Sequence, residues 1–146
     1  MTVRIGRALA SDVDAMLPLI VEHAAFERDR ATAEPETLRA ALSGDAPRLL
    51  AWLATSGDRA IGYASATIDF STWRARLYLN LDCLFVAPAD RGQGVGRALL
   101  AAARAHALDR GIDELQWQTP AWNEDAIRFY RRLGASDAPK QRFRLL

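Results

Sequence analysis

A short glycine-rich stretch, Arg91 to Arg97, carries the clearest chemical signal in the sequence. It reads Arg-Gly-Gln-Gly-Val-Gly-Arg and lies between an apolar run at 77–86 and a helical pattern at 95–110. Glycine loses much backbone entropy on folding, so this spacing indicates a loop that needs glycine conformations. Free backbone N–H groups at a helix start, together with the helix dipole, bind anions. We therefore predict a turn that binds a pyrophosphate, with Arg91 or Arg97 adding positive charge.

Asp82 is the second chemical candidate, because it interrupts the apolar strand pattern from Leu81 to Val86. Burial in such a strand would raise the pKa of its carboxyl and suit it to accept a proton. An Asp that pairs with an Arg, or accepts backbone N–H bonds, would give the same pattern, so both interpretations stay open. Strand alternation places Cys83 on the opposite face, where we expect a buried thiol that is not a nucleophile.

Hydrophobic periodicity predicts the elements that must position these residues. The first half has a strand at 2–8, a helix from Ser11, a second helix after Pro35 that ends at 43–45, and strands at 48–54 and 60–70. Pro18 indicates a kink or a restart of the first helix, and Gly62 breaks the return strand. The second half has a strand at 76–86, a helix at 95–110, a strand at 113–118, a helix from Asn123 to Gly134, and a strand at 141–146.

This order predicts one domain over residues 1–146, with an α/β (mixed α+β) fold and helices on both faces of a mixed sheet. The strands at 76–86 and 113–118 would run parallel, because the helix at 95–110 joins them. Parallel strands of this kind leave a crevice at their carboxyl ends, where α/β sheets bind ligands.

Composition argues against several functional classes. Lys and Arg number 19 against 18 Asp and Glu, so the net charge of +1 offers no basic excess for nucleic acid. One cysteine and two distant histidines argue against a disulfide and against a metal site. The sequence shows neither a signal peptide nor an apolar run of about 20 residues, and we expect a cytoplasmic protein without a membrane partner.

Two motifs resemble the Gcn5-related N-acetyltransferase (GNAT) superfamily. The segment from Arg91 to Gly96 fits that family's Arg/Gln-x-x-Gly-x-Gly/Ala loop, and no Lys-Ser/Thr follows it as in nucleotide-binding loops. The segment Trp122 to Ala135 is similar to the family's last helix, in wording closest to the diamine (spermidine/spermine) acetyltransferase branch. Residues 22–27 and 73–86 are also similar to that branch. The resemblance implies the GNAT fold, a mostly antiparallel sheet whose one parallel pair is splayed around the cofactor.

The resemblance also implies acetyl-CoA as cosubstrate and assigns residues to it. The expected contacts are Leu84, Phe85, Val86, Arg91, Gly92, Gln93, Gly94, Val95, Gly96, Arg97, Asn123, Tyr130 and Arg132. Tyr130 would protonate the leaving thiolate, although it would also suit a core position beside Ile127 and Leu133. Asp82 stands where the diamine branch has Glu, and its shorter side chain favours a relaying water between it and the amine.

The expected reaction is direct attack by a primary amine on acetyl-CoA in a ternary complex. The amine belongs to a small molecule: a diamine or polyamine, an amino acid or an amino-bearing xenobiotic. Glu27, Asp29 and Asp82 would bind it. Other carboxylates and several arginines lie nearby in sequence, so the acidic bias is weak: Glu22, Glu34, Asp69, Arg28, Arg30, Arg74 and Arg76. Acetylation of protein Lys side chains or N-termini, and a non-catalytic acyl-CoA sensor, remain alternatives. A homodimer is expected, paired through the strand at 141–146.

Overall fold

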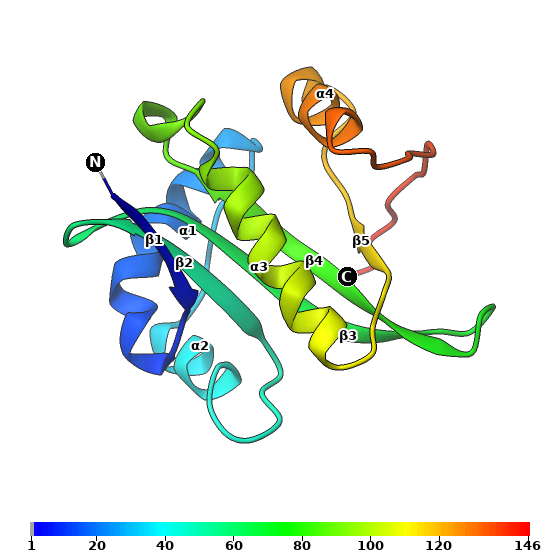
Figure 1. The fold of residues 1–146 in the computed structure, drawn as a ribbon, viewed down its shortest axis with the longest axis horizontal. Helices are drawn as coiled ribbons and strands as arrows, with labels where there is room; N and C mark the ends of the chain where they lie inside the picture. Colours follow the sequence, from blue (N-terminus) through cyan, green and yellow to red (C-terminus); the bar gives the residue numbers. More distant parts are fainter. Residues whose placement is uncertain (1) are drawn as a thin grey trace.

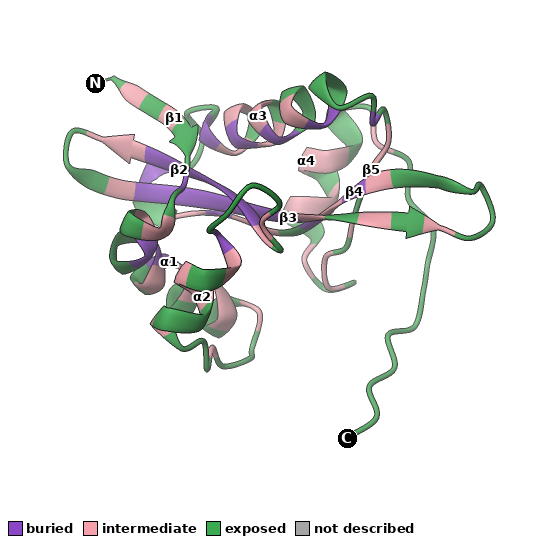
Figure 2. Ribbon diagram, turned by 90° about the horizontal axis from the view of Figure 1, so that it is seen from below, coloured by how far each residue is buried: buried purple, intermediate pink, exposed green. Residues whose placement is uncertain are grey.

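A five-stranded sheet forms the centre of the structure, and helices lie on both of its faces (Figures 1 and 2). The structure is a computed structural model that describes residues 2–146. Its elements are β1 (Val3–Arg7), the 3-10 turn η1 (Ala10–Asp12), α1 (Val13–Phe26), α2 (Pro35–Ala41), β2 (Leu50–Ser56), β3 (Arg59–Ser71), β4 (Arg76–Val86), the 3-10 turn η2 (Pro88–Asp90), α3 (Val95–Asp109), β5 (Leu115–Trp117) and α4 (Glu124–Arg132).

The strands lie side by side in chain order, from β1 to β5. The first four pair antiparallel with their neighbours, whereas β4 and β5 pair parallel. A parallel pair needs a crossover connection, and α3 provides it. The predicted mixed sheet with one parallel pair is therefore confirmed.

Separate groups of helices pack on the two faces of the sheet. Against one face, α3 buries Val95, Leu99, Ala103 and Ala107, a stripe at every fourth residue. Against the other face, α1 and α2 pack around Tyr63 and its neighbours. Figure 2 shows α3 on one side of the sheet and α1 and α2 on the other. Leu99 has no exposed surface, so its truncation to Ala would destabilise the fold by about 2–5 kcal/mol.

The sequence predicted that Gly62 would break its strand, but β3 runs through Gly62 without interruption. A Cβ atom at this position would lie 2.9 Å from the carbonyl oxygen of Phe85. The glycine is thus required for the close approach of β3 and β4. Likewise, α1 continues through Pro18, and η1 precedes it.

The predicted strand at 141–146 is wrong. Residues 135–146 have no regular structure, Phe143 and Leu145 are exposed, and the tail leads away from the sheet (Figure 2). The neighbouring edge strand β5 has only three residues instead of the predicted six, so it offers little edge for a further strand. The segment expected to pair two copies of the chain is therefore not a strand. The homodimer itself stays a prediction.

Within residues 2–146, no helix has the combination of length and apolar character needed to cross a bilayer. In the same part of the chain, no group of three or more His, Cys, Asp or Glu side chains is placed to hold a metal ion.

Candidate active site

A cleft opens where β4 and β5 separate, at the carboxyl ends of the parallel pair, as predicted from the sequence. Their pairing ends at Leu81 and Trp117, and the chain after Trp117 leaves the sheet toward α4 (Figure 1). The next residue of β4, Asp82, forms a β-bulge, because β3 pairs with Leu81 and with Cys83 but not with Asp82. The cleft has a volume of about 980 Å³.

Beyond the bulge, one edge of β4 faces the cleft instead of another strand. Leu84, Phe85 and Val86 line the cleft, and β5 has no residues paired with them. An extended amide-containing chain can hydrogen-bond to such an edge as a further strand would. This part of β4 is suited to hold a ligand with a long amide arm.

The glycine-rich loop lies at one end of the cleft and has the backbone that the sequence predicted. Gly92 and Gly94 have φ values of 78° and 81°, in the left-handed region that favours glycine. Gly94 is the N-cap of α3, and its carbonyl accepts the first bond of the helix from the N–H of Ala98. The N–H groups of residues 95–97 therefore have no acceptor within the helix, and they form an anion-binding helix start.

An ion pair between Arg59 and Asp90, which the sequence did not predict, holds the residue just before this loop. Asp90, in η2, is 2% exposed and accepts hydrogen bonds of 2.9 and 3.0 Å from both terminal nitrogens of Arg59. These bonds lower the pKa of the Asp90 carboxyl below its usual value. Since the partners are 31 residues apart, neither residue alone indicated the pair.

The two arginines of the loop differ in their freedom to bind an anion. The Arg91 Nε donates a 2.8 Å hydrogen bond to the carbonyl of Val86, and its guanidinium lies over the rings of Phe26 and Phe85. Arg97 lines the cleft, and among the described residues it forms no ion pair or side-chain hydrogen bond. Arg97 is therefore the better-placed cation for a phosphate, with Arg91 shaping the loop.

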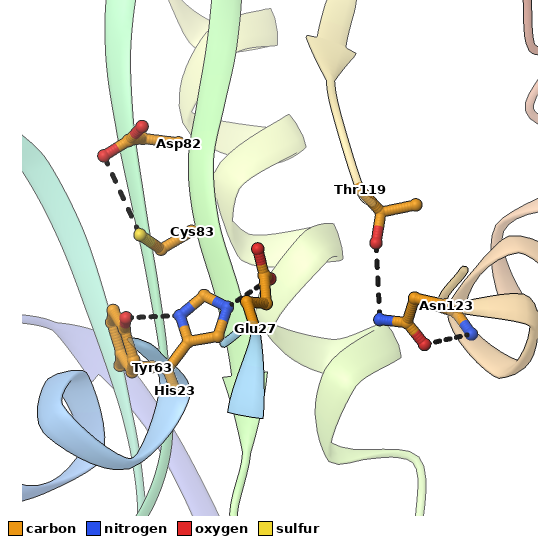
Figure 3. Close-up of polar contacts among 8 residues, drawn as sticks. His23, Glu27, Tyr63, Asp82, Cys83, Thr119 and Asn123 are labelled. Atoms are coloured by element: carbon orange, nitrogen blue, oxygen red, sulfur yellow. Dashed lines mark hydrogen bonds and ion pairs between the residues drawn. The ribbon is translucent and has the colours of Figure 1, made fainter. Parts of the chain in front are cut away.

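The start of α4 forms the wall of the cleft opposite β4. Asn123 caps this helix as predicted, because its Oδ1 accepts a bond from the N–H of Ala126 at 3.4 Å. Its Nδ2 lies 3.3 Å from the hydroxyl of Thr119 in the segment that follows β5 (Figure 3). The cap thus fixes the direction in which α4 leaves the splayed strand.

Tyr130 lies in the same wall, with its ring edge-on to Trp117 at a centroid distance of 5.2 Å. Burial, and to a smaller extent the charge of Glu27, raise the pKa of Tyr130 to about 12. The phenol is therefore protonated at neutral pH, as a proton donor must be. Trp117 fills the space beneath it, so Tyr130 lines the cleft and also packs against the fold.

Asp82 departs from the sequence prediction in its surroundings. It lines the cleft, but it is exposed and not buried in the apolar strand. The bulge is the physical reason, because an extra residue in one strand leaves the regular alternation of inward and outward positions. Its carboxylate is accessible to a ligand, and the predicted burial of Asp82 is wrong.

The predicted position of Cys83 on the opposite face is wrong for the same reason. Cys83 lines the cleft beside Asp82, and its Sγ lies 3.7 Å from the Asp82 Oδ2 (Figure 3). Burial, followed by the Asp82 charge, raises the pKa of the Cys83 thiol. A thiol held in its protonated form fits the expectation that it is not a nucleophile.

Only part of the predicted acidic set lies in the cleft. Glu27 and Asp29, at the end of α1, line it together with Asp82. Glu22, Glu34 and Asp69 do not. The predicted carboxylates that line the cleft thus come from two parts of the chain that are far apart in sequence, the end of α1 and the bulge of β4.

His23 and Tyr63 are site residues that the sequence reasoning missed. His23 lies on α1 with its Nε2 2.8 Å from Glu27 Oε2 and its Nδ1 2.7 Å from the Tyr63 hydroxyl (Figure 3). Both bonds are satisfied when Tyr63 donates to Nδ1 and the Nε2–H donates to Glu27. The His23 ring also stacks on Phe85 at 5.0 Å. The spacing of His23 and Glu27, one helical turn, was the signal available in the sequence.

The structure brings most of the predicted site residues together around this one cleft. Those that line it are Glu27, Asp29, Asp82, Leu84, Phe85, Val86, Arg91, Gly92, Gly94, Val95, Gly96, Arg97, Asn123, Tyr130 and Arg132. Gln93 is exposed and does not line the cleft. The cleft therefore has an anion-binding end, a free strand edge, a protonated phenol and a group of carboxylates, which suits group transfer from an anionic carrier to a cation-forming acceptor.

Comparisons with known proteins agree with this arrangement. The thialysine N-epsilon-acetyltransferase of Bos taurus is 32% identical over 145 residues, a match that covers 92% of this chain and 85% of that protein. An aminoglycoside acetyltransferase from an uncultured soil metagenomic sample, solved with trehalose, has a TM-score of 0.83 at 20% identity and covers 99% of this chain and 96% of its own. An aminoglycoside N-acetyltransferase solved with CoA has a TM-score of 0.80 at 20% identity, with coverages of 99% and 95%.

The two structural matches show the shared fold, and the sequence matches show the family. The profile described as the acetyltransferase (GNAT) family matches residues 17–135, which include the loop, the bulge and all of α4 in one stretch. The chain therefore belongs to the acetyltransferase (GNAT) family.

Proposed function

We propose that this acetyltransferase moves the acetyl group of acetyl-CoA to a primary amine of a small molecule, by direct attack in a ternary complex. One observation carries the proposal: a single cleft holds an anion-binding helix start at one end and the carboxylates of Glu27 and Asp82 on its walls. An acyl donor with a pyrophosphate fits the first feature. An amine that arrives as an ammonium ion fits the second.

The donor half uses the loop and the strand edge. The N–H groups of residues 95–97 and the Arg97 guanidinium bind the pyrophosphate of acetyl-CoA, and the backbone of residues 84–86 binds its amide-containing arm. In this arrangement the thioester points toward the bulge at Asp82, next to the wall of the cleft that contains Tyr130.

The chemical step needs one proton acceptor and one proton donor. Asp82, through a water molecule, takes a proton from the ammonium, and the free amine then attacks the thioester carbonyl carbon. The new C–N bond forms as the C–S bond breaks, and the amine gives up its second proton to solvent. Tyr130 donates its proton to the departing thiolate, because its raised pKa keeps the phenol protonated. Exchange with solvent then returns a proton to Tyr130 and removes the proton from Asp82.

The acceptor is a side-chain or alkyl amine: a diamine or polyamine, an amino acid or an amino-bearing xenobiotic. The relative named for the N-epsilon position of thialysine supports an amine of this size. Phe26 and Arg28, at the end of α1, contact Trp122 at the start of α4, with the Arg28 guanidinium 4.0 Å from the ring centre. These contacts join the two walls of the cleft and favour a small molecule over a protein chain.

The experiment that tests the proposal is thiol release from acetyl-CoA with a panel of amines. We expect turnover with small primary amines and none with secondary alcohols of the same size. Turnover only with peptides would instead support acetylation of protein Lys side chains or N-termini. Tight acetyl-CoA binding without turnover on any amine would support a sensor and contradict the proposal.

A further inference from the structure

A second cavity lies under α1 and α2 and meets the acceptor half of the cleft. Its volume is about 120 Å³, and it shares Ile20, Tyr63, Asp82 and Cys83 with the cleft. Native interiors rarely contain voids larger than a water molecule, and this one has room for about four non-hydrogen atoms at about 30 Å³ each. A space of this size next to a proposed reaction centre requires an explanation.

The inner walls of the cavity are apolar. Met16 from α1, Leu38 from α2, and Leu42 and Leu49 from the chain after α2 line it, together with Val13. Its polar groups are the Asp82 carboxylate, the Cys83 thiol and the hydroxyls of Tyr63 and Ser65 on the neighbouring strands. Asp82 is the sole charged group among the lining residues that the structure describes. The polar side chains that the structure describes around the cavity therefore all lie on its strand side, where it meets the cleft.

We propose that this cavity binds the apolar tail of the acceptor, so that the preferred substrate is a primary amine with a compact hydrocarbon tail of four or five carbons. This inference rests on the proposed function and narrows its substrate class. The Asp82 carboxylate, which lines both spaces, binds the ammonium group, and the tail fills the space beneath α1 and α2. An apolar tail gains free energy by leaving water for such walls.

The same geometry disfavours a diamine in this position. The far end of a diamine carries a second ammonium, and the inner walls, as far as the structure describes them, offer it no carboxylate. Burying an unpaired ammonium is costly, whereas a methyl group of the same size is not. Pentylamine and butane-1,4-diamine are therefore a matched pair of probes, since they differ only in the last group of the chain.

The test is the dependence of kcat/KM on tail length, measured by thiol release with ethylamine, propylamine, butylamine and pentylamine. We expect kcat/KM to rise about fourfold for each added methylene and pentylamine to exceed butane-1,4-diamine at least about tenfold. Leu38→Phe, which fills the cavity, should flatten the rise. The matched control, Leu108→Phe, changes an exposed leucine of α3 away from both spaces and should keep the slope.

The outcomes separate the two proposals. Turnover that does not depend on tail length, or that is faster with the diamine, would overturn the proposal that the cavity binds the tail. It would leave the proposed function intact. If no amine reacts, the proposed function fails. A titration of the wild-type protein with pentylamine and butane-1,4-diamine in the presence of CoA then tests tail binding in the cavity independently of turnover. Stronger binding of pentylamine supports tail binding in the cavity, and equal or weaker binding overturns it. The same titration replaces the variant if Leu38→Phe does not fold.

Discussion

The Nε2 atom of His23 lies 2.8 Å from the Oε2 atom of Glu27, one helical turn further along α1. Tyr63, on β3, holds the other ring nitrogen at 2.7 Å, so the imidazole links the carboxylate to the sheet. Glu27 ends α1 at the edge of a polar loop, where an unsupported side chain would sample many rotamers. The bond to His23 holds one carboxylate oxygen and leaves the other available to the cleft.

Replacement of His23 by Leu should raise KM for the amine about tenfold, because a charge-assisted hydrogen bond that orients Glu27 is lost. The kcat value and KM for acetyl-CoA should stay within about twofold. Initial-rate kinetics with both substrates varied will show this split. Tyr63→Phe should give a smaller rise of the same kind, since the His23–Glu27 bond remains. A fall in kcat with an unchanged amine KM would contradict the positioning role of His23.

Replacement of Tyr130 by Phe should lower kcat by about 10- to 100-fold with little change in the KM for acetyl-CoA, because the variant lacks the proton donor. The Tyr130 pKa of about 12 lies above the usual tyrosine value of 10, so the phenol keeps its proton through pH 10. The wild-type rate should therefore show no loss near pH 10 from this group. Tyr78→Phe, on β4 outside the cleft lining, is the matched control. Wild-type turnover in Tyr130→Phe would remove the acid role.

The features that the sequence predicted are those set by local patterns. The stripe from Val95 to Ala107 repeats every fourth residue, and Gly92 and Gly94 adopt the conformations that glycine permits. Such patterns depend on the residues nearest in the chain, so one sequence is enough to recognise the helix, the loop and the parallel pair around them. The family resemblance then assigned Asn123 and Tyr130 to the same cofactor as the loop.

The features that the sequence could not predict depend on register and on distant partners. The bulge at Asp82 adds one residue to β4, and no period-two pattern reveals it, so the exposure of Asp82 and the position of Cys83 were both mispredicted. His23 and Tyr63 are 40 residues apart and meet only after α1 packs on the sheet. The terminal segment has an alternating pattern, but a strand also needs a free partner edge, and β5 provides only three residues.

Replacement of Asp82 by Asn should lower kcat/KM for the amine by about 10- to 100-fold, because the variant cannot accept a proton from the ammonium. Asp82→Glu should retain most of the wild-type kcat/KM, since the carboxylate remains and the exposed bulge has room for one more methylene. The measurement is kcat/KM for the amine with the three proteins at one pH. Wild-type kcat/KM in Asp82→Asn would assign proton acceptance to another group and reject Asp82 as the base.

The ion pair of Arg59 and Asp90 supports the glycine-rich loop. Asp90→Asn should weaken CoA binding about tenfold, because the loop from Arg91 to Gly94 loses the charged anchor that Arg59 provides. The amine KM should not change, and calorimetry with CoA alone will separate this effect from catalysis. Arg74→Ala, which removes an exposed partner of Glu114, is the control.

The same pair also makes a pH prediction for stability. The folded pKa of Asp90 lies below its usual value of 3.8, so the pair stabilises the fold above that value. This contribution decreases as the pH falls through the lowered pKa, where the carboxylate becomes protonated in the folded state. The thermal midpoint of the wild type should therefore fall more steeply between pH 5 and pH 3 than that of Asp90→Asn. Equal slopes for the two proteins would show that the pair does not couple proton binding to folding.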